Sequence, residues 1–154
     1  MAHIEIITDD LTGDETRALI AFHLSDMRAT SPEGSVHALD IDGLRHPDVT
    51  FWSAWIGGEV AGIGALKRLD EDRGEIKSMR VDDRFRGTGV GRALLRRIMS
   101  AARERGMTSL WLETGSTDEF LPAHRLYASE GFLSCGPFED YREDPFSVYM
   151  TRTL

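Results

Sequence analysis

The feature that most constrains the fold of this chain is the segment 86–91 (RGTGVG), which lies between a strand pattern and a helix pattern. Every second residue of this segment is a glycine. Glycine lets the backbone approach a ligand closely and adopt positive φ angles. The first N–H groups of the following helix have no intrahelical partner, and the helix dipole is positive at that end. A strand, a glycine loop and a helix in this order predict a cradle for a phosphate group.

Two common phosphate-binding loops fit this segment poorly. A Walker loop ends in Gly-Lys followed by Ser or Thr, whereas this loop ends in Gly-Arg-Ala. A dinucleotide loop has the spacing G-x-G-x-x-G and directly follows its strand, but five residues separate Val81 from Gly87 here. Glu113 lies about where a ribose-binding acid would be expected, so a dinucleotide enzyme is kept as a minor alternative.

Hydrophobic periodicity predicts one α/β (α+β) domain over residues 1–154. The turn at Gly57-Gly58 and a second turn at residues 71–74 predict an antiparallel meander. Thr12 and Glu15 have the spacing of a capping box at the start of the first helix. The predicted strands are 3–8, 49–56, 59–69, 75–81, 108–113, 132–138 and 146–153, and the predicted helices are 12–27, 88–105 and 122–130, with a short helix within 36–44.

Composition indicates the cellular compartment of the protein and the kinds of partner that it binds. The net charge is −8, whereas nucleic-acid binders are usually basic. Seven arginines fall between Arg84 and Arg105, which favours a local anionic ligand. The single cysteine, Cys135, fits a reducing compartment. No signal peptide or apolar run of about 18 residues is present, so we expect a soluble cytoplasmic protein without a membrane partner.

Three segments in this order resemble the GCN5-related N-acetyltransferase (GNAT) family: residues 75–81 (EIKSMRV), 86–95 (RGTGVGRALL) and 123–132 (AHRLYASEGF). Their spacing matches the family over roughly residues 48–150. The resemblance implies a mixed, mostly antiparallel sheet of six or seven strands with about four helices. It also implies that the sheet is splayed between the strands that end at Val81 and Glu113.

The resemblance implies acetyl-CoA as co-substrate, with its pantetheine arm in the splay. No metal is expected, because His3, His23 and His46 show no metal-ligand spacing. The arm would pair with the backbone at Met79 and Val81, and the N–H groups of residues 87–92 would hold the pyrophosphate. Many family members have an asparagine where this chain has Phe120, so we expect the arm to pack differently here. The implied coenzyme-binding residues are Met79, Arg80, Val81, Arg86, Gly87, Thr88, Gly89, Val90, Gly91 and Arg92.

Acyl transfer from a thioester to an amine needs a base for the amine and an acid for the departing sulfur. Tyr127 is the candidate acid, because a phenol is protonated at neutral pH and the resemblance places it near the thioester. Glu75 is the candidate base, since it begins the central strand as a glutamate does in the family's histone-acetylating members. The structural alternatives are a core tyrosine and a strand-end carboxylate that pairs with Lys77.

Several other side chains have open roles. His37 lies in the long segment that should border the acceptor pocket, and His124 lies near Tyr127 in sequence. Trp52 and Trp55 should project to opposite faces of their strand, one into the core and one toward the acceptor. The predicted function is acetyl transfer from coenzyme A to a primary amine of a small molecule by direct attack. The alternative is a non-catalytic acyl-CoA sensor, and the resemblance makes a homodimer plausible.

Overall fold

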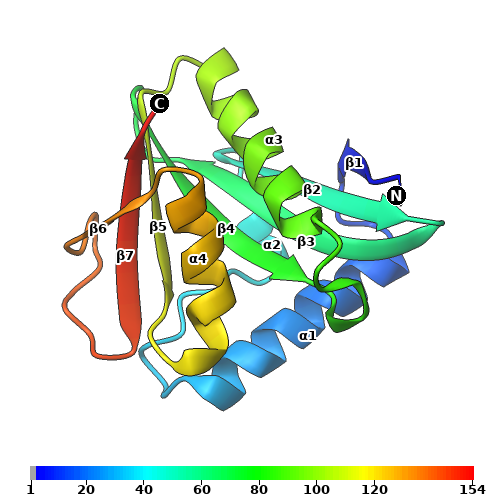
Figure 1. The fold of residues 1–154 in the computed structure, drawn as a ribbon, viewed down its shortest axis with the longest axis horizontal. Coiled ribbons are helices and arrows are strands. Elements are labelled where there is room, and N and C mark those ends of the chain that lie inside the picture. Colours follow the sequence, from blue (N-terminus) through cyan, green and yellow to red (C-terminus); the bar gives the residue numbers. More distant parts are fainter. Residues whose placement is uncertain (1–2) are drawn as a thin grey trace.

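The computed structural model describes residues 3–154 (Figure 1). Within them, seven strands form one sheet in the order β1-β2-β3-β4-β5-β7-β6, in which only β4 and β5 are parallel neighbours. The predicted mixed, mostly antiparallel sheet is therefore confirmed. The strands are β1 (Glu5–Thr8), β2 (Val49–Ile56), β3 (Glu59–Arg68), β4 (Arg73–Val81), β5 (Ser109–Gly115), β6 (Leu133–Cys135) and β7 (Ser147–Thr153).

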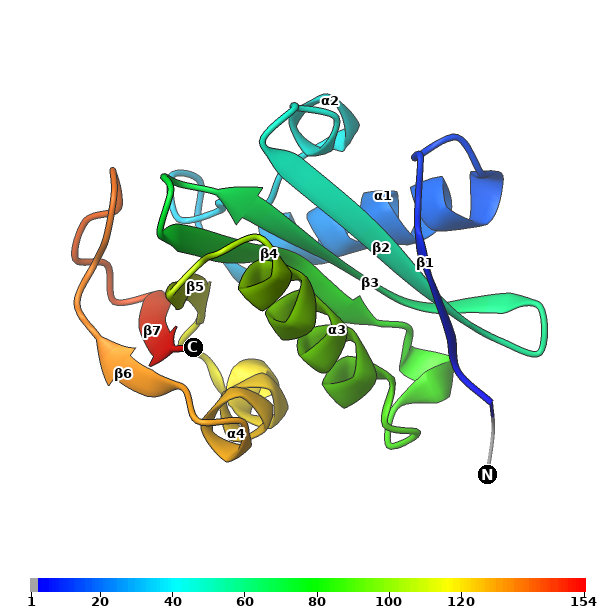
Figure 2. The same ribbon diagram turned by 90° about the horizontal axis from the view of Figure 1, so that it is seen from above.

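Helices cover both faces of this sheet (Figure 2). α1 (Asp14–Thr30) and α2 (Ile41–Leu44) lie on one face, and α3 (Val90–Glu104) and α4 (Leu121–Ser129) lie on the other. Two short 3-10 turns, η1 (Asp83–Phe85) and η2 (Asp118–Phe120), precede α3 and α4. No helix formed by residues 3–154 is both long and apolar enough to cross a membrane.

The sheet separates two apolar cores. Trp52 of β2 packs with Leu94 and Ile98 of α3 on one face, while the adjacent Phe51 packs with Ile20 of α1 on the other. Neighbouring residues of a strand point to opposite faces, which explains the division. The buried residues of α3 recur every three or four positions, so one stripe of this helix is fixed against the sheet.

A β-bulge in β4 changes which side chains share a face. Ile63 pairs with Arg80 and Ala65 pairs with Lys77, so two β4 residues oppose the single residue between them on β3. Ser78, one of the two, has a φ of 57°. Met79 packs against the core on the α3 side, whereas Arg80 forms an ion pair with Asp26 of α1. The bulge therefore brings the Arg80 side chain onto the α1 face.

The parallel pair β4–β5 opens partway along its length. Pairing extends from Arg73–Ser109 to Ile76–Leu112, and the rest of the two strands is not paired. The backbone of residues 77–81 is hydrogen-bonded to β3 on one side only. This confirms the predicted splay at the centre of the sheet.

Two local predictions were wrong. Thr12 does not cap α1, because its Oγ1 donates to Asp10 Oδ1 at 2.6 Å and the helix begins after Gly13 without a side-chain cap. The strand predicted over 132–138 is limited to the three residues of β6. Pro137 follows closely, and proline has no N–H to donate to a strand partner.

Gly62 provides a test of the packing between β3 and α3. A Cβ atom there would lie 2.8 Å from Val90 Cγ1 and 3.0 Å from the Arg80 carbonyl oxygen. We expect Gly62→Ala to lower the free energy of unfolding by about 1–3 kcal/mol through overpacking, as measured by urea denaturation. Gly136→Ala is the matched control, since nothing lies within 4 Å of its Cβ position. Equal effects of the two substitutions would contradict this packing.

Candidate active site

A cavity of about 740 Å³ opens at the splay between β4 and β5. Its walls come from β4, the glycine loop, the end of β5, α4, α1 and the loop that follows α1. Its volume is in the range of pockets that hold small molecules and cofactors. The site is therefore large enough for a coenzyme arm and a small acceptor together.

The glycine loop forms one end of this cavity. Gly87 and Gly89 have φ angles of 75° and 90°, and Gly89 is the residue that directly precedes α3. These left-handed conformations favour glycine, and they leave the first N–H groups of α3 accessible. Arg86, Gly87, Gly89, Val90, Gly91 and Arg92 line the cavity.

Three polar side chains around the loop have different surroundings. Thr88 Oγ1 donates to the Phe85 carbonyl at 2.5 Å, so this side chain closes the turn. Arg86 pairs with Asp83 at 2.8 Å at the surface, and such exposed pairs are weak. Arg84 pairs with Asp82 and Glu59 outside the cavity. The structure thus brings Arg86 to the site but not the Arg84 side chain.

The unpaired part of β4 forms the floor of the cavity. Met79, Arg80 and Val81 all line it, and their backbone edge toward β5 has no strand partner. Buried backbone N–H and C=O groups are normally hydrogen-bonded. A ligand with amide groups satisfies them as an added strand would. At the end of β5, the Phe120 ring packs directly against Gly115 and also lines the cavity.

Tyr127 lies on the opposite wall, on α4. Its side chain is 5% exposed, packs against Phe132 and reaches the cavity. Burial, followed by the negative charge of Glu113, raises the pKa of the Tyr127 phenol. The hydroxyl therefore keeps its proton at neutral pH, as an acid toward a departing thiolate must.

Glu75 belongs to a buried polar cluster on the α1 face of β4. Its Oε2 accepts hydrogen bonds from the Tyr141 hydroxyl at 2.5 Å and from Lys77 Nζ at 3.1 Å. Lys77 Nζ also donates to the Tyr141 oxygen at 3.0 Å. The predicted pairing with Lys77 is present, and Tyr141 from the β6–β7 loop joins it.

Glu113 was not predicted as a catalytic candidate. It lies on β5, one residue beyond the last β4–β5 pair, and lines the cavity. Burial raises its pKa to about 7, and the nearby Glu75 carboxylate adds to this increase while Lys77 opposes it. A carboxyl group with this pKa suits a general base at neutral pH. A glutamate among the apolar residues of β5 was the available sequence signal.

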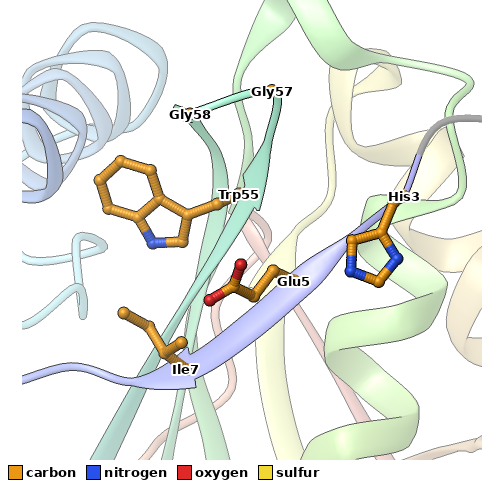
Figure 3. A pocket seen from close by; sticks show the side chains of 6 residues that line it. All are labelled: His3, Glu5, Ile7, Trp55, Gly57 and Gly58. Carbon is orange, nitrogen blue, oxygen red and sulfur yellow. The ribbon is translucent and has the colours of Figure 1, made fainter.

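Of the histidines and tryptophans with open roles, some line the cavity and others lie away from it. His37 lines the cavity and its ring contacts the Tyr141 ring edge-on, with centroids 4.9 Å apart. His124 Nε2 hydrogen-bonds the Gly115 carbonyl at 2.7 Å, which gives it a structural role. Trp55 does not reach the acceptor side. It lines a separate small pocket with Glu5 and Ile7 of β1 (Figure 3). Trp52 is in the core, as predicted for one of the two tryptophans, whereas the acceptor role suggested for the other was wrong.

His23 predicts how stability depends on pH. It is buried on α1, and burial, with Arg80 nearby, lowers its pKa from 6.5 to about 4. At a pH between about 4 and 6.5, His23 is protonated in the unfolded chain but neutral in the folded chain. Stability should therefore fall as the pH falls from 6.5 toward 4, by roughly 3 kcal/mol from this group.

Urea denaturation of wild type and His23→Gln across that interval checks this expectation. The loss of stability with acid should be smaller in the variant. His46→Gln is the control, since its side chain is 60% exposed. Identical pH dependence of wild type and His23→Gln would contradict the assignment.

The model of the acetyltransferase (GNAT) family matches residues 16–132, which is most of the chain. The chain belongs to the GNAT acetyltransferase family. The match spans β4, the glycine loop and Tyr127, so it includes the main walls of the cavity.

Related proteins agree with this membership. The chain is 51% identical to the uncharacterized N-acetyltransferase YsnE of Bacillus subtilis over 99% of both chains. It is 49% identical to the uncharacterized N-acetyltransferase YedL of Escherichia coli over 97% of this chain and 94% of that one. The fold matches a GNAT acetyltransferase of Elizabethkingia anophelis solved with acetyl-CoA bound, with a TM-score of 0.72, 21% identity and 98% coverage of each chain. This GNAT protein is accordingly an N-acetyltransferase.

Proposed function

We propose that this acetyltransferase moves the acetyl group of acetyl-CoA directly onto a primary amine of a small molecule. The observation that carries the proposal is the cavity at the splay, where the glycine loop, the free edge of β4 and Tyr127 meet. The pyrophosphate binds residues 86–92, and the pantetheine amides pair with the backbone near Met79 and Val81. The volume of the cavity supports a small acceptor.

The proposed reaction is one displacement at the acetyl carbonyl. The amine nitrogen attacks the carbonyl carbon, and a free N–H of β4 at Met79 or Val81 stabilises the oxyanion. The carbon–sulfur bond then breaks, and Tyr127 gives its proton to the departing thiolate. The amine loses its proton to a carboxylate on the α1 face of the sheet.

Two carboxylates are candidates for this base, and their surroundings favour Glu113. Glu75 Oε2 is already held by Tyr141 and Lys77. Glu113 has a pKa of about 7 and lines the same cavity. We therefore propose Glu113 as the base and assign Glu75 the positioning of Tyr141 and Lys77. Comparison of the pH profiles of Glu113→Gln and Glu75→Gln distinguishes this assignment from the prediction that Glu75 is the base.

Binding and turnover together test the proposal. Acetyl-CoA and coenzyme A should raise the melting temperature, because a ligand at 100 times its Kd stabilises the native state by about 2.7 kcal/mol. NAD should not. Acetyl-CoA should then release thiol only when a small amine is present. Stabilisation by NAD alone, or coenzyme binding without turnover on any small amine, would overturn the proposal, and the latter result would indicate a sensor.

A further inference from the structure

Arg80 is a largely buried guanidinium that lines the acceptor side of the cavity. Its side chain is 13% exposed, and Nη1 donates to Asp26 Oδ2 at 2.6 Å. This is the one hydrogen bond that the Arg80 side chain forms within residues 3–154. A guanidinium has five N–H donors, and a buried charge is costly unless its donors are satisfied. Four of the Arg80 N–H groups thus have no hydrogen-bond partner within residues 3–154.

The Phe22 ring lies against one side of the Arg80 guanidinium. The guanidinium carbon lies 5.0 Å from the centroid of this ring, which lines the same cavity. Stacking on an aromatic ring covers one face of the guanidinium and leaves its edge open. Two parallel N–H groups on that edge match the two oxygens of a carboxylate. The arrangement therefore favours a planar anionic group.

Glu113 and the Arg80 side chain lie at different levels along the α1 face of the sheet. Glu113 lies just beyond the Ile76–Leu112 pair, which places it level with Lys77, while Arg80 lies three residues further along β4. Lys77 Nζ donates to Glu75 and Tyr141, so one of its three N–H groups also remains. A molecule with a carboxylate at one end and an amine at the other can therefore meet the unpartnered N–H groups of Arg80 at one end and the Glu113 carboxylate at the other.

We infer that the acceptor is an amino acid with a free carboxylate, and that Arg80 is a specificity-determining residue that binds this carboxylate. The inference rests on the proposed function and deepens it. Arg80 holds the carboxylate near α1, and the amine then lies toward Glu113 and the acetyl carbon. An amine without a carboxylate lacks this anchor and leaves the Arg80 donors unsatisfied.

Steady-state kinetics on matched acceptor pairs test the inference. Each pair is an amino acid and the amine that has the same side chain but no carboxylate. Wild type should prefer the amino acid by at least about tenfold in kcat/KM. Arg80→Gln should raise the KM of the amino acid by roughly 10- to 100-fold and change the KM of the paired amine little. Arg80→Lys, which keeps the charge but not the fork, should lie between them.

Controls separate recognition from folding. Arg103→Gln removes an arginine from the exposed face of α3 and should leave all constants unchanged. The affinity of each variant for acetyl-CoA should match wild type, because the coenzyme arm is proposed to pair with the backbone of β4 and not with the Arg80 side chain. Arg80→Gln removes the partner of Asp26 and should lower the melting temperature, so all kinetics are measured well below it. If Arg80→Gln does not fold, the wild-type panel and Arg80→Lys still decide the question.

Failure of the carboxylate assignment and failure of the proposed function would give different results. Equal wild-type use of both members of each pair, or equal loss on both in Arg80→Gln, would overturn the carboxylate assignment and leave acetyl transfer to small amines intact. Absence of turnover on every member of every pair, with acetyl-CoA bound, would overturn the proposed function and this inference with it.

Discussion

Replacing Tyr127 by phenylalanine is expected to lower kcat by about 10²- to 10⁴-fold while leaving the affinity for acetyl-CoA nearly unchanged. The phenol faces the cavity from α4 and is protonated at neutral pH, so it has a proton to give to the departing thiolate. Phenylalanine keeps the ring packing against Phe132 and removes only the hydroxyl. Steady-state kinetics and coenzyme titration on the same preparation measure both effects.

A second buried tyrosine provides the control for this experiment. The Tyr149 hydroxyl donates to the Arg142 carbonyl at 2.7 Å, and this ring is also almost fully buried. Tyr149→Phe should lower stability by about 1 kcal/mol, the usual contribution of one hydrogen bond, with little effect on kcat. An unchanged kcat in Tyr127→Phe would remove Tyr127 from the acid role.

Glu113→Gln is expected to cause a loss of similar size and to change the pH profile. In wild type, kcat/KM should rise with pH through about 7, because Glu113 must lose its proton before it can accept one from the amine. Glutamine cannot titrate, so the limb near pH 7 should disappear and kcat should fall by about 10²- to 10⁴-fold. Rates measured from pH 5.5 to 9 over a range of amine concentrations give kcat/KM and kcat at each pH and show both changes.

Glu75→Gln is the informative comparison. If Glu75 positions Tyr141 and Lys77, this variant should keep a limb near pH 7, although it is less active. If the limb instead disappears in Glu75→Gln and persists in Glu113→Gln, the original prediction of Glu75 as the base is correct and our assignment of Glu113 is wrong.

Much of the fold could be predicted because local signals and long-range order agree. The turn at Gly57-Gly58, the glycine loop and the stripe of α3 each depend on nearby residues, and the structure has all three where they were expected. The start of α1 could not be predicted as well. Asp9 and Asp10 accept hydrogen bonds from Leu11 and Thr12 in competition with a capping box, and a three-residue spacing does not reveal this competition.

The acceptor side of the site was less predictable than the coenzyme side. The glycine loop is contiguous in sequence, whereas the Glu75 cluster includes Tyr141 from a loop 66 residues away. The placement of Arg80 depends on the bulge at Ser78, because simple alternation would put residue 80 on the opposite face from Glu75. Neither feature has a local sequence signal, so the structure was needed to recognise the polar face.

Transfer of labelled acetyl is the most direct test of the central claim. The enzyme would be incubated with acetyl-CoA that carries isotopic label in its acetyl group, together with a set of amino acids and amines, and all products would be examined by mass spectrometry. If the protein transfers acetyl groups directly to small amines, the label should move onto the nitrogen of a small amine, in equal amount to the coenzyme A released. Tight binding of acetyl-CoA with no labelled amide, or label only on protein side chains, would contradict this transfer.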